Sequence, residues 1–327
     1  MNARRIGMLA AVVAAAGWAA SGIRADATGP GQTDTVFAAQ EDAAAKPQAG
    51  AKPAFQAGPK AGEFSFDTGL LSGLLRPGGR SIGLNPLKCG DNQLAGAYGI
   101  FSHYRLLTSK TRYGGGAWDF PSTATLADGT VEARWPAAKD RPFEIVARYR
   151  WVAPDSLDLV STVKAVEDLP KFELFLASYF NGFDNSFVYA QPAGGQPGFL
   201  EATRIRGDWQ MYPRDDEAVG LIQDGRWKRP PNPVDWKILP HYAGALAMRR
   251  DAKTGLTALV MAAKDDCFAV ATPFSGEGHR SLYLCLLGKD IPAGQSASAR
   301  TRLVIAKGLT DQQAIERYEA FVKGLAK

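Results

Sequence analysis

The sequence has few of the side chains that most often hold metals or form disulfides, with three histidines and three cysteines in 327 residues. No two histidines have the i, i+4 spacing of a helical zinc site, and the cysteine spacing matches no zinc pattern. We therefore predict no metal centre and no resident cofactor. Calcium alone stays open, because carboxylates gather at 215–217 and 265–266, although neither segment matches an EF-hand loop.

The sequence also lacks an apolar run of the roughly 20 residues that cross a bilayer. Its N-terminal apolar run, residues 6–20, follows Arg4 and Arg5 and precedes a small-x-small site at 25–27. This order is typical of a secretory signal peptide. We expect residues 1–27 to be removed on export, which leaves a secreted or periplasmic protein without a membrane span.

The sequence also lacks a large excess of charge of either sign. The net charge of the chain is +5, and removal of residues 1–27 takes away three Arg and one Asp, which leaves +3. This balance, without a Lys/Arg run or a Gly-rich phosphate loop, argues against nucleic acids and anionic membranes as partners. A G-x-S-x-G elbow is absent, which argues against Ser-His-Asp chemistry. We expect neutral or mildly acidic small molecules or polymers as partners.

Two regions follow the export signal. Residues 28–61 hold few large apolar groups, so they cannot offset the entropy cost of ordering, and they predict a disordered linker. Residues 62–327 contain no second linker and predict one domain, in which short alternating runs between Gly, Pro, Asn and Asp are typical of an all-β sandwich. The predicted strands are 122–127, 130–136, 143–152, 157–166, 171–179, 218–223, 243–249, 256–262, 267–272, 281–287 and 297–306.

Local signals add detail to this domain. The tripeptide Ala-Asp-Gly at 127–129 predicts a hairpin turn between the first two of these strands. One helix is predicted at 311–325, where a Thr-x-x-Gln capping-box pattern precedes apolar residues at helical spacing. We expect this helix to pack on the outside of the sandwich. Cys267 and Cys285 fall in neighbouring strand-like runs, so a disulfide between them and burial as free thiols both stay open.

Residues 149–182 read YRWVAPDSLDLVSTVKAVEDLPKFELFLASYFNG, two apolar-rich strands that close on the aromatic turn Tyr-Phe-Asn-Gly. This order resembles the galactose mutarotase (aldose 1-epimerase) family, whose central region ends in H-x-Y-F-N. The resemblance extends as a weak pattern over 90–305 and implies an antiparallel β-supersandwich, here with the C-terminal helix, that handles sugars. It also implies that the family's acid and base are missing, because Ala177 stands in place of its histidine and Ala271 or Thr272 in place of its glutamate.

Sugar sites combine aromatic rings that stack on C–H groups with polar side chains that bind hydroxyls, and with Arg or Lys where the sugar carries a carboxylate. Four loop-like segments have this composition: 102–119, 204–216, 224–242 and 274–280. The candidate catalytic residues in them are His103, His241, Asp208, His279 and Glu277. The candidate substrate-binding residues are Arg105, Arg112, Tyr113, Trp118, Asp119, Trp209, Arg214, Trp227 and Tyr242.

The resemblance makes His103 the best match to the family's sugar-binding histidine, with Tyr104 where the family has glycine. Glu277 or His279 would take over a lost catalytic role from a position further along the loop. Each segment also has a plainer interpretation. These interpretations are a hydrogen-bonded histidine near a strand end, surface charges that pair in water, tryptophans that cover a sheet edge, and a solvated hairpin tip.

Three hypotheses about function follow. The first is an enzyme, an epimerase, lyase or hydrolase, that works on a mono-, oligo- or polysaccharide by general acid–base chemistry. The second is an exported carbohydrate-binding protein without turnover, which Ala177 favours, with the sugar on the concave sheet face. The third is a non-catalytic structural or envelope-associated β-sandwich. Convergence of His103, Trp118, Asp208 and His241 on one concavity would favour the first two hypotheses, and their dispersal over the surface would favour the third.

Overall fold

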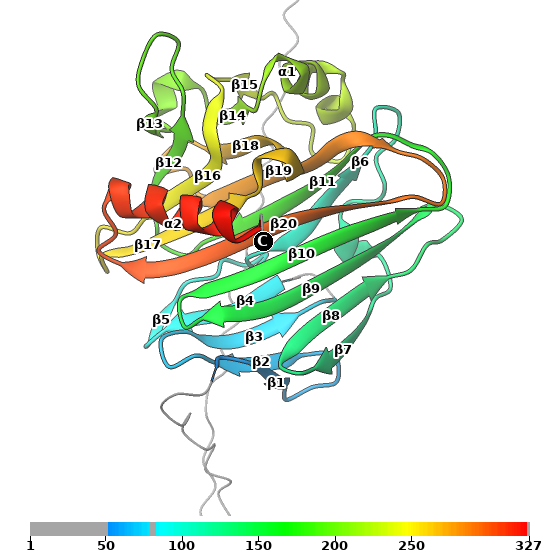
Figure 1. Cartoon of the computed structure of the whole chain (residues 1–327), viewed down its shortest axis with the longest axis horizontal. Helices are drawn as coiled ribbons and strands as arrows, with labels where there is room; N and C mark the ends of the chain where they lie inside the picture. The colour runs from blue at the N-terminus through cyan, green and yellow to red at the C-terminus, as the bar shows by residue number, and fades with distance from the viewer. Residues whose placement is uncertain (1–51, 79–82, 326–327) are drawn as a thin grey trace, which may run out of the picture. The chain divides into compact units, whose positions relative to one another are not determined.

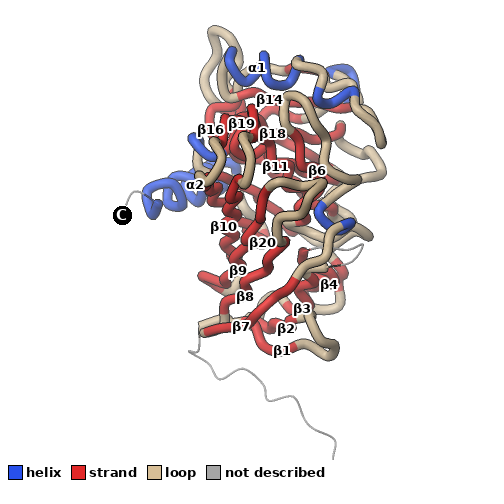
Figure 2. The backbone as a smooth tube through the Cα atoms, turned by 90° about the vertical axis from the view of Figure 1, so that its right-hand side faces the viewer, coloured by secondary structure: helices blue, strands red, loops and turns tan. Residues whose placement is uncertain are grey.

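The fold is that of a computed structural model in which residues 52–78 and 83–325 are described. Two large sheets stack face to face in this part of the chain, and a third, smaller sheet lies at one end of the stack (Figures 1 and 2). The small sheet has the order β1 (Phe55–Ala57), β2 (Phe64–Asp67), β3 (Ser72–Arg76), β4 (Gly83–Cys89) and β5 (Asn92–Gln93).

The first large sheet has nine strands and the second has six, and every pairing in them is antiparallel except that of β14 with β15. The nine-stranded sheet has the order β13 (Gly198–Glu201), β12 (Asn185–Ala190), β16 (Tyr242–Arg250), β17 (Leu256–Ala262), β20 (Ser296–Lys307), β10 (Ser156–Ala165), β9 (Phe143–Ala153), β8 (Thr130–Trp135) and β7 (Thr123–Ala127). The six-stranded sheet has the order β15 (Lys237–Ile238), β14 (Trp209–Pro213), β18 (Cys267–Pro273), β19 (Ser281–Ile291), β11 (Leu169–Tyr179) and β6 (Ser102–Leu107).

Strand alternation decides which side chains enter the core between the two large sheets. In β11, Leu174 and Leu176 belong to this main core, whereas Phe175 and Ala177 belong to a second apolar cluster on the other face of the six-stranded sheet. The six-stranded sheet is therefore apolar on both faces, which explains the nearly continuous apolar run in β11. Its outer face is the one that carries the candidate site.

The helix α2 (Asp311–Leu325) covers the outer face of the nine-stranded sheet (Figure 1). Ala314, Tyr318 and Phe321 of α2 pack against Leu259 and Met261 of β17. These β17 side chains point away from the main core because they alternate with core residues along the strand. The predicted position of the C-terminal helix, outside the sandwich, is confirmed.

Two local predictions are also confirmed. A hairpin turn joins β7 and β8, with Asp128 at φ 48° and Gly129 at φ 70°, the left-handed pair that this turn needs. The capping box of α2 forms as expected, since the Gln313 backbone N–H donates to Thr310 Oγ1 at 3.2 Å and the Thr310 N–H donates to Gln313 Oε1 at 2.9 Å.

The prediction of a strand at 218–223 is wrong, because this segment is the helix α1 (Asp216–Gln223). The Asp215 carboxylate caps the helix by accepting a hydrogen bond from the Ala218 N–H at 2.9 Å, and two further acidic residues occupy the first turn. Both features favour a helix N-terminus. The remaining predicted strands match β7–β11 and β16–β20 to within a few residues.

The predicted linker, residues 28–61, ends too late. Its last part holds β1, in which Phe55 is 2% exposed and contacts the rings of Phe66 and Trp151 at 5.7 and 6.1 Å. One aromatic side chain with two ring partners buries enough apolar surface to order a short edge strand. Residues 28–51 and the predicted signal peptide, 1–27, lie outside the described residues.

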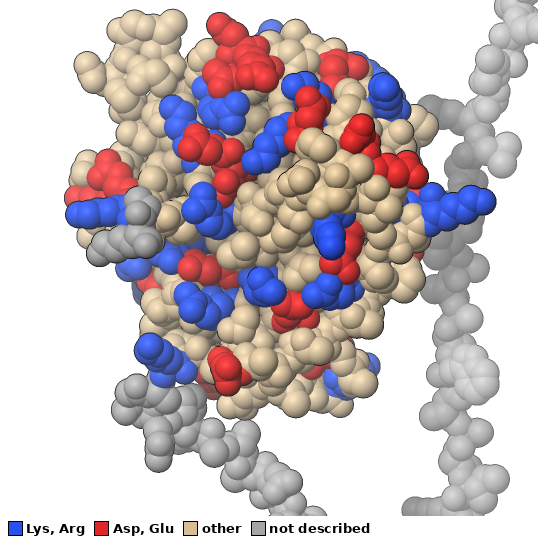
Figure 3. Space-filling model, turned by 45° about the vertical axis from the view of Figure 1, so that its right-hand side comes forward, with Lys and Arg blue, Asp and Glu red and all other residues tan. Residues whose placement is uncertain are grey.

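Cys267 and Cys285 are buried free thiols. Cys267 belongs to the main core and Cys285 to the cluster on the other face of the sheet, so the sheet itself separates the two sulfur atoms. Figure 3 shows blue and red side chains mixed over the visible surface, in keeping with the balanced composition. Within 52–78 and 83–325, no helix has the length and apolar character to span a membrane.

Candidate functional site

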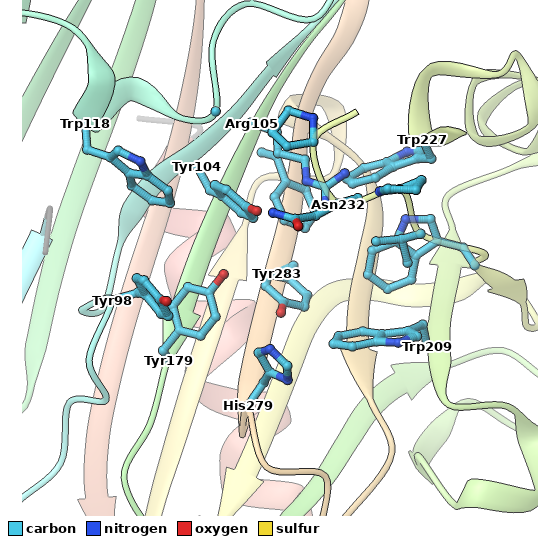
Figure 4. A pocket seen from close by; sticks show the side chains of 16 residues that line it. Tyr98, Tyr104, Arg105, Trp118, Tyr179, Trp209, Trp227, Asn232, His279 and Tyr283 are labelled. Atoms are coloured by element: carbon cyan, nitrogen blue, oxygen red, sulfur yellow. The ribbon is translucent and has the colours of Figure 1, made fainter. Parts of the chain in front are cut away.

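A pocket of about 560 Å³ opens on the outer face of the six-stranded sheet (Figure 4). Strands β11 and β19 supply its floor, and β6 together with the loops around η1 (Ala117–Asp119) and η3 (Arg226–Lys228) supplies its walls. Most of the lining side chains are aromatic. The lining residues are Tyr98, Tyr104, Arg105, Gly115, Trp118, Phe175, Tyr179, Trp209, Trp227, Pro231, Asn232, Pro233, Val234, Trp236, His279 and Tyr283.

The register of the sheet sets one row of the floor. Ala177 of β11 and Ala271 of β18 both pair with Tyr283 of β19, and all three belong to the cluster on the outer face. The two positions that the mutarotase resemblance assigns to a histidine and a glutamate are therefore occupied by alanines on either side of a tyrosine. Thr272, the other candidate for the glutamate position, is wholly buried and donates to the Ser281 carbonyl at 3.0 Å.

Tyrosine hydroxyls are the polar groups at the centre of the pocket. Figure 4 shows Tyr283 between the two aromatic walls, with Tyr179 beside it. The hydroxyl of Ser281 donates to the Tyr283 hydroxyl at 2.6 Å. Burial raises the pKa of Tyr283 to about 12 and also raises the pKa of Tyr179, so both hydroxyls are protonated near neutral pH and can donate to a ligand oxygen.

Flat aromatic surfaces form the walls. Trp118 stacks on Tyr104 with ring centroids 4.8 Å apart and an interplanar angle of 16°. On the other side, Trp209 and Trp227 each meet Trp236 edge to face, at 5.9 and 5.3 Å. Edge-to-face contacts hold indole rings in fixed orientations. The pocket is therefore a rigid aromatic slot with an open mouth.

Arg105 is the charged group in the wall. The residue is 4% exposed. Its guanidinium carbon lies 5.2 Å from the Tyr104 ring centroid and 4.8 Å from the Trp227 ring centroid. Nη2 donates to the Asn232 carbonyl at 2.7 Å, whereas Nε and Nη1 are buried without a hydrogen-bond partner in the described chain. Two aromatic rings thus hold a charged group whose donors are only partly used.

An ion-pair network lies behind this wall. Arg226 Nη1 donates to Glu173 Oε2 at 3.1 Å, and Arg226 also pairs with Asp224 at 2.8 Å. Burial raises the pKa of the Glu173 carboxyl group, and the neighbouring Arg226 opposes that rise. Because Arg226 precedes Trp227 in η3, the network fixes the indole ring of Trp227 against the floor strand β11.

His279 stands at the mouth of the pocket with a carboxylate behind it. Nδ1 of His279 lies 2.8 Å from Glu277 Oε1, and the imidazole ring meets Trp209 edge to face at 5.3 Å. A carboxylate on Nδ1 selects the tautomer that leaves Nε2 as the acceptor. The pair therefore has the arrangement of a general base that is oriented by a carboxylate.

The structure brings five predicted site residues together in the pocket: Arg105, Trp118, Trp209, Trp227 and His279. Three others support it from behind. Glu277 orients His279, Asp119 accepts from the Gly115 N–H at 2.6 Å, and Arg112 donates to the Pro231 carbonyl at 2.5 Å. The arginine and the aspartate thereby hold two lining segments in place.

The other predicted site residues lie elsewhere. His103 is wholly buried between the large sheets, where Nε2 lies 2.8 Å from Ser161 Oγ, and burial lowers its pKa to about 3. Tyr242 belongs to the main core and Tyr113 packs against it, and the Tyr242 hydroxyl donates to the Cys267 carbonyl at 2.6 Å. The remaining three form surface ion pairs: Asp208 with Arg204, Arg214 with Asp215, and His241 with Asp216.

His103 misses the pocket for a local reason. The β6–β11 pairing shifts register beside His103, so that His103 pairs with the core residue Leu176 and Arg105 with the pocket residue Phe175. Such an irregularity is invisible in the alternation of the sequence. Carboxylates at 215–217 and 265–266 likewise serve as a helix cap and ion pairs, and within the described ranges no group of three or more potential metal ligands occurs.

The candidate residues omit seven aromatic or amide side chains that line the pocket: Tyr98, Tyr104, Phe175, Tyr179, Asn232, Trp236 and Tyr283. Three of these, Tyr104, Asn232 and Trp236, lie in the predicted segments 102–119 and 224–242. A usable signal existed for Phe175 and Tyr179, because they alternate with Ala177, the position that resemblance placed in the site. The place of Tyr283 in the pocket depends on the pairing register of β18 with β19, which only the folded sheet shows.

No protein-family model matches the chain, and no curated protein matches it. Among solved structures, the Slr1438 protein from Synechocystis sp. PCC 6803 is 11% identical, with a TM-score of 0.50 over 76% of this chain and 96% of that one. A galactose mutarotase-like protein from Lactobacillus casei ATCC 334 is 10% identical, with a TM-score of 0.48 over 75% of this chain and 100% of that one. A putative aldose 1-epimerase from Escherichia coli K12 is 10% identical, with a TM-score of 0.44 over 74% of this chain and 98% of that one.

At these identities the likeness is one of fold. The architecture expected from the sequence is the one observed: an antiparallel β-sandwich, rich in strands, with a helix at its C-terminal end, which shares its fold with the Slr1438 protein.

Proposed function

We propose that this protein binds a carbohydrate in the aromatic pocket. The observation that carries the proposal is the composition of the pocket, about 560 Å³ in volume, in which tryptophan rings, tyrosine hydroxyls and one arginine line the same space. This volume falls within the roughly 300–1,000 Å³ typical of small-molecule sites. Aromatic faces suit the C–H faces of a sugar ring, and the hydroxyls and the arginine suit its oxygens.

The placement of the polar atoms supports a sugar over a flat apolar ligand. Tyr179 and Tyr283 offer hydroxyls at the floor, while Trp118 and Trp209 stand on opposite sides of it (Figure 4). A ring that lies between these walls would place its hydroxyl edge on the tyrosines. Buried hydroxyls gain from a polar ligand and lose with an apolar one, which would leave them unpaired.

The test is a binding screen of the purified mature chain against mono-, oligo- and polysaccharides by calorimetry and thermal shift. We expect saturable binding that Trp209→Ala weakens by tenfold or more. Phe199→Ala is the matched control, because Phe199 is an aromatic residue of β13 that packs with Tyr189 and lies outside the pocket lining. Absence of binding to every sugar would overturn the proposal and favour a structural role for the sandwich.

A second function, turnover by acid–base chemistry, has one specific observation in its favour, the His279–Glu277 pair at the pocket mouth. The alanines at 177 and 271 weigh against the family's own reaction. Optical rotation, reducing ends and unsaturated products would be followed together for each bound sugar. Loss of product in His279→Gln, with binding retained, would establish an enzyme, and binding without any product would establish a binding protein.

We also propose that the protein is exported, on the strength of the charged and apolar segments within residues 1–27. N-terminal sequencing of the protein recovered from periplasm or medium tests this. A mature chain that begins close to residue 28 is the expected result. Retention of Met1 in the cell interior would contradict export.

A further inference from the structure

Arg105 is a charged side chain that the fold holds buried with most of its hydrogen-bonding capacity unused. It is 4% exposed, and among the described residues no ion pair includes it. Guanidinium groups stay protonated in proteins, so Arg105 cannot avoid this situation by losing its charge. A buried charge without a partner costs free energy, and such a cost is characteristic of a site built for a ligand.

The carboxylate that lies behind Arg105 is already engaged. Glu173 receives Arg226 at 3.1 Å, and Arg226 is itself shared with Asp224. These two carboxylates outnumber Arg226 by one negative charge, but neither of them forms an ion pair or a hydrogen bond with Arg105, whose Nε and Nη1 have no partner among the described residues. Arg112, the other cation nearby, donates to the carbonyls of Gly115 and Pro231 and does not line the pocket.

The surroundings of Arg105 suit an anion bound at a fixed position. Tyr104 and Trp227 sandwich the guanidinium, and the Asn232 carbonyl holds Nη2, so the remaining donors have little freedom to turn. Figure 4 shows Arg105 at the opposite end of the pocket from His279, with Tyr283 between them. A ligand whose ring lies over Tyr283 would present a substituent to Arg105.

We propose that the sugar bound in this pocket is acidic, with a singly charged oxyanion on its ring, such as the carboxylate of a uronic acid, received by Arg105. This inference rests on the proposed carbohydrate-binding function and names its ligand class. One cation in the pocket matches one negative charge, whereas a phosphate ester, with a charge near −2, would leave charge unmatched in an apolar slot.

The test compares sugars that differ only in this group: a uronic acid, the parent hexose, its 6-sulfate and its 6-phosphate. We expect calorimetry to show that the uronic acid or the sulfate binds about tenfold or more tightly than the parent hexose. The two acidic arms distinguish a carboxylate from a sulfate ligand. Strongest binding of the phosphate, or equal binding of all four, would overturn the inference while leaving carbohydrate binding intact.

The matched variants are Arg105→Met, which keeps an apolar stem, and Arg206→Met, which removes one positive charge from an exposed residue outside the pocket lining. We expect Arg105→Met to abolish the preference for the acidic sugar, so that the uronic acid and the parent hexose bind the variant with similar affinity. Arg206→Met should keep the preference. Loss of the preference in both variants would assign it to the overall charge and overturn the role of Arg105.

Thermal unfolding separates this role from a structural one. If Arg105 serves a ligand, Arg105→Met removes a poorly partnered buried charge, so the free variant should melt at the same temperature as the wild type or higher. The acidic sugar should raise the melting temperature of the wild type and not that of the variant. A variant that melts well below the wild type would show that Arg105 is needed for folding. Failure of every sugar, acidic or neutral, to bind the wild type would instead overturn the proposed function itself.

Discussion

Arg226 donates to the carboxylate of Glu173 at 3.1 Å, and both side chains are completely shielded from solvent. Glu173 belongs to β11 in the floor of the pocket, and Arg226 begins the η3 turn that carries Trp227 in its wall. The pair therefore ties one wall of the pocket to the floor. The position of the Trp227 side chain in the pocket therefore depends on the Arg226–Glu173 ion pair as well as on the backbone.

Replacement of Arg226 by Met should destabilise the protein by about 3–5 kcal/mol, because it leaves Glu173 as an unpaired buried acid. Urea unfolding at neutral pH measures the loss. In the double variant Arg226→Met with Glu173→Leu, a substantial part of the stability should return, since no buried charge remains at this position. Equal losses in the single and double variants would show that the pair contributes through packing alone.

The buried imidazole of His103 should make the fold sensitive to acid. Burial lowers its pKa to about 3 from 6.5, so the neutral form is favoured in the folded state. This contribution to stability is complete above about pH 6.5 and is lost as the pH falls toward 3, by about 1.4 kcal/mol per pH unit. Free energies of unfolding between pH 7 and pH 4 measure the slope.

The control for this slope is His103→Asn, which can still hydrogen-bond to Ser161 and does not titrate. Carboxylates contribute to acid sensitivity in both proteins, so the difference between the two curves isolates His103. We expect the curves to converge as the pH falls. Parallel curves would mean that the imidazole is not held neutral in the fold.

Replacement of Arg249 in β16 should lower the free energy of unfolding more than replacement of its neighbour Arg250. Arg249 is wholly buried, and its guanidinium donates to the carbonyls of Phe183, Ser281 and Asp184 at 2.7, 3.1 and 3.1 Å. Arg249→Met leaves three carbonyls without these donors and should cost on the order of 3 kcal/mol. The neighbouring Arg250→Met, at a partly exposed ion pair with Asp311, should cost less than about 1 kcal/mol. Similar losses in the two variants would contradict this assignment.

Two glycines should respond to alanine in opposite directions. A Cβ on Gly244 would lie 2.4 Å from the Tyr318 ring, which packs α2 on the sheet, so Gly244→Ala should destabilise by about 1–3 kcal/mol. A Cβ on Gly220, within α1, would have no neighbouring atom within 4 Å outside its own helix backbone and chain neighbours, so Gly220→Ala should stabilise by about 0.5–1 kcal/mol. Thermal melts of the two variants test both signs. Destabilisation by Gly220→Ala would show that α1 does not need helix propensity at this position.

Much of the fold was readable from the sequence because its signals are local. Alternation of apolar residues located β7–β11 and β16–β20, and the capping box located α2 at 311–325. The same local reasoning failed at 218–223, because a short apolar segment fits both a strand and a helix, and the Asp215 cap decided between them. The list of predicted strands also lacks β1–β6 and β12–β15. The first of these, β1, is held by a ring contact with Trp151, far along the chain.

The site was predictable only in part, because local composition shows in the sequence and contacts between distant segments do not. Composition selected Arg105, Trp118, Trp209, Trp227 and His279, because charged and aromatic residues stand out in loops. The sequence by itself determined the strands β7–β11 and β16–β20, the C-terminal helix and these residue types. Only the tertiary structure decided that a register shift places His103 in the core, that pairing across β11, β19 and β18 puts Tyr283 between two alanines, and that Arg105 is buried without an acidic partner. Register and burial arise from contacts between distant segments, and no local pattern encodes them.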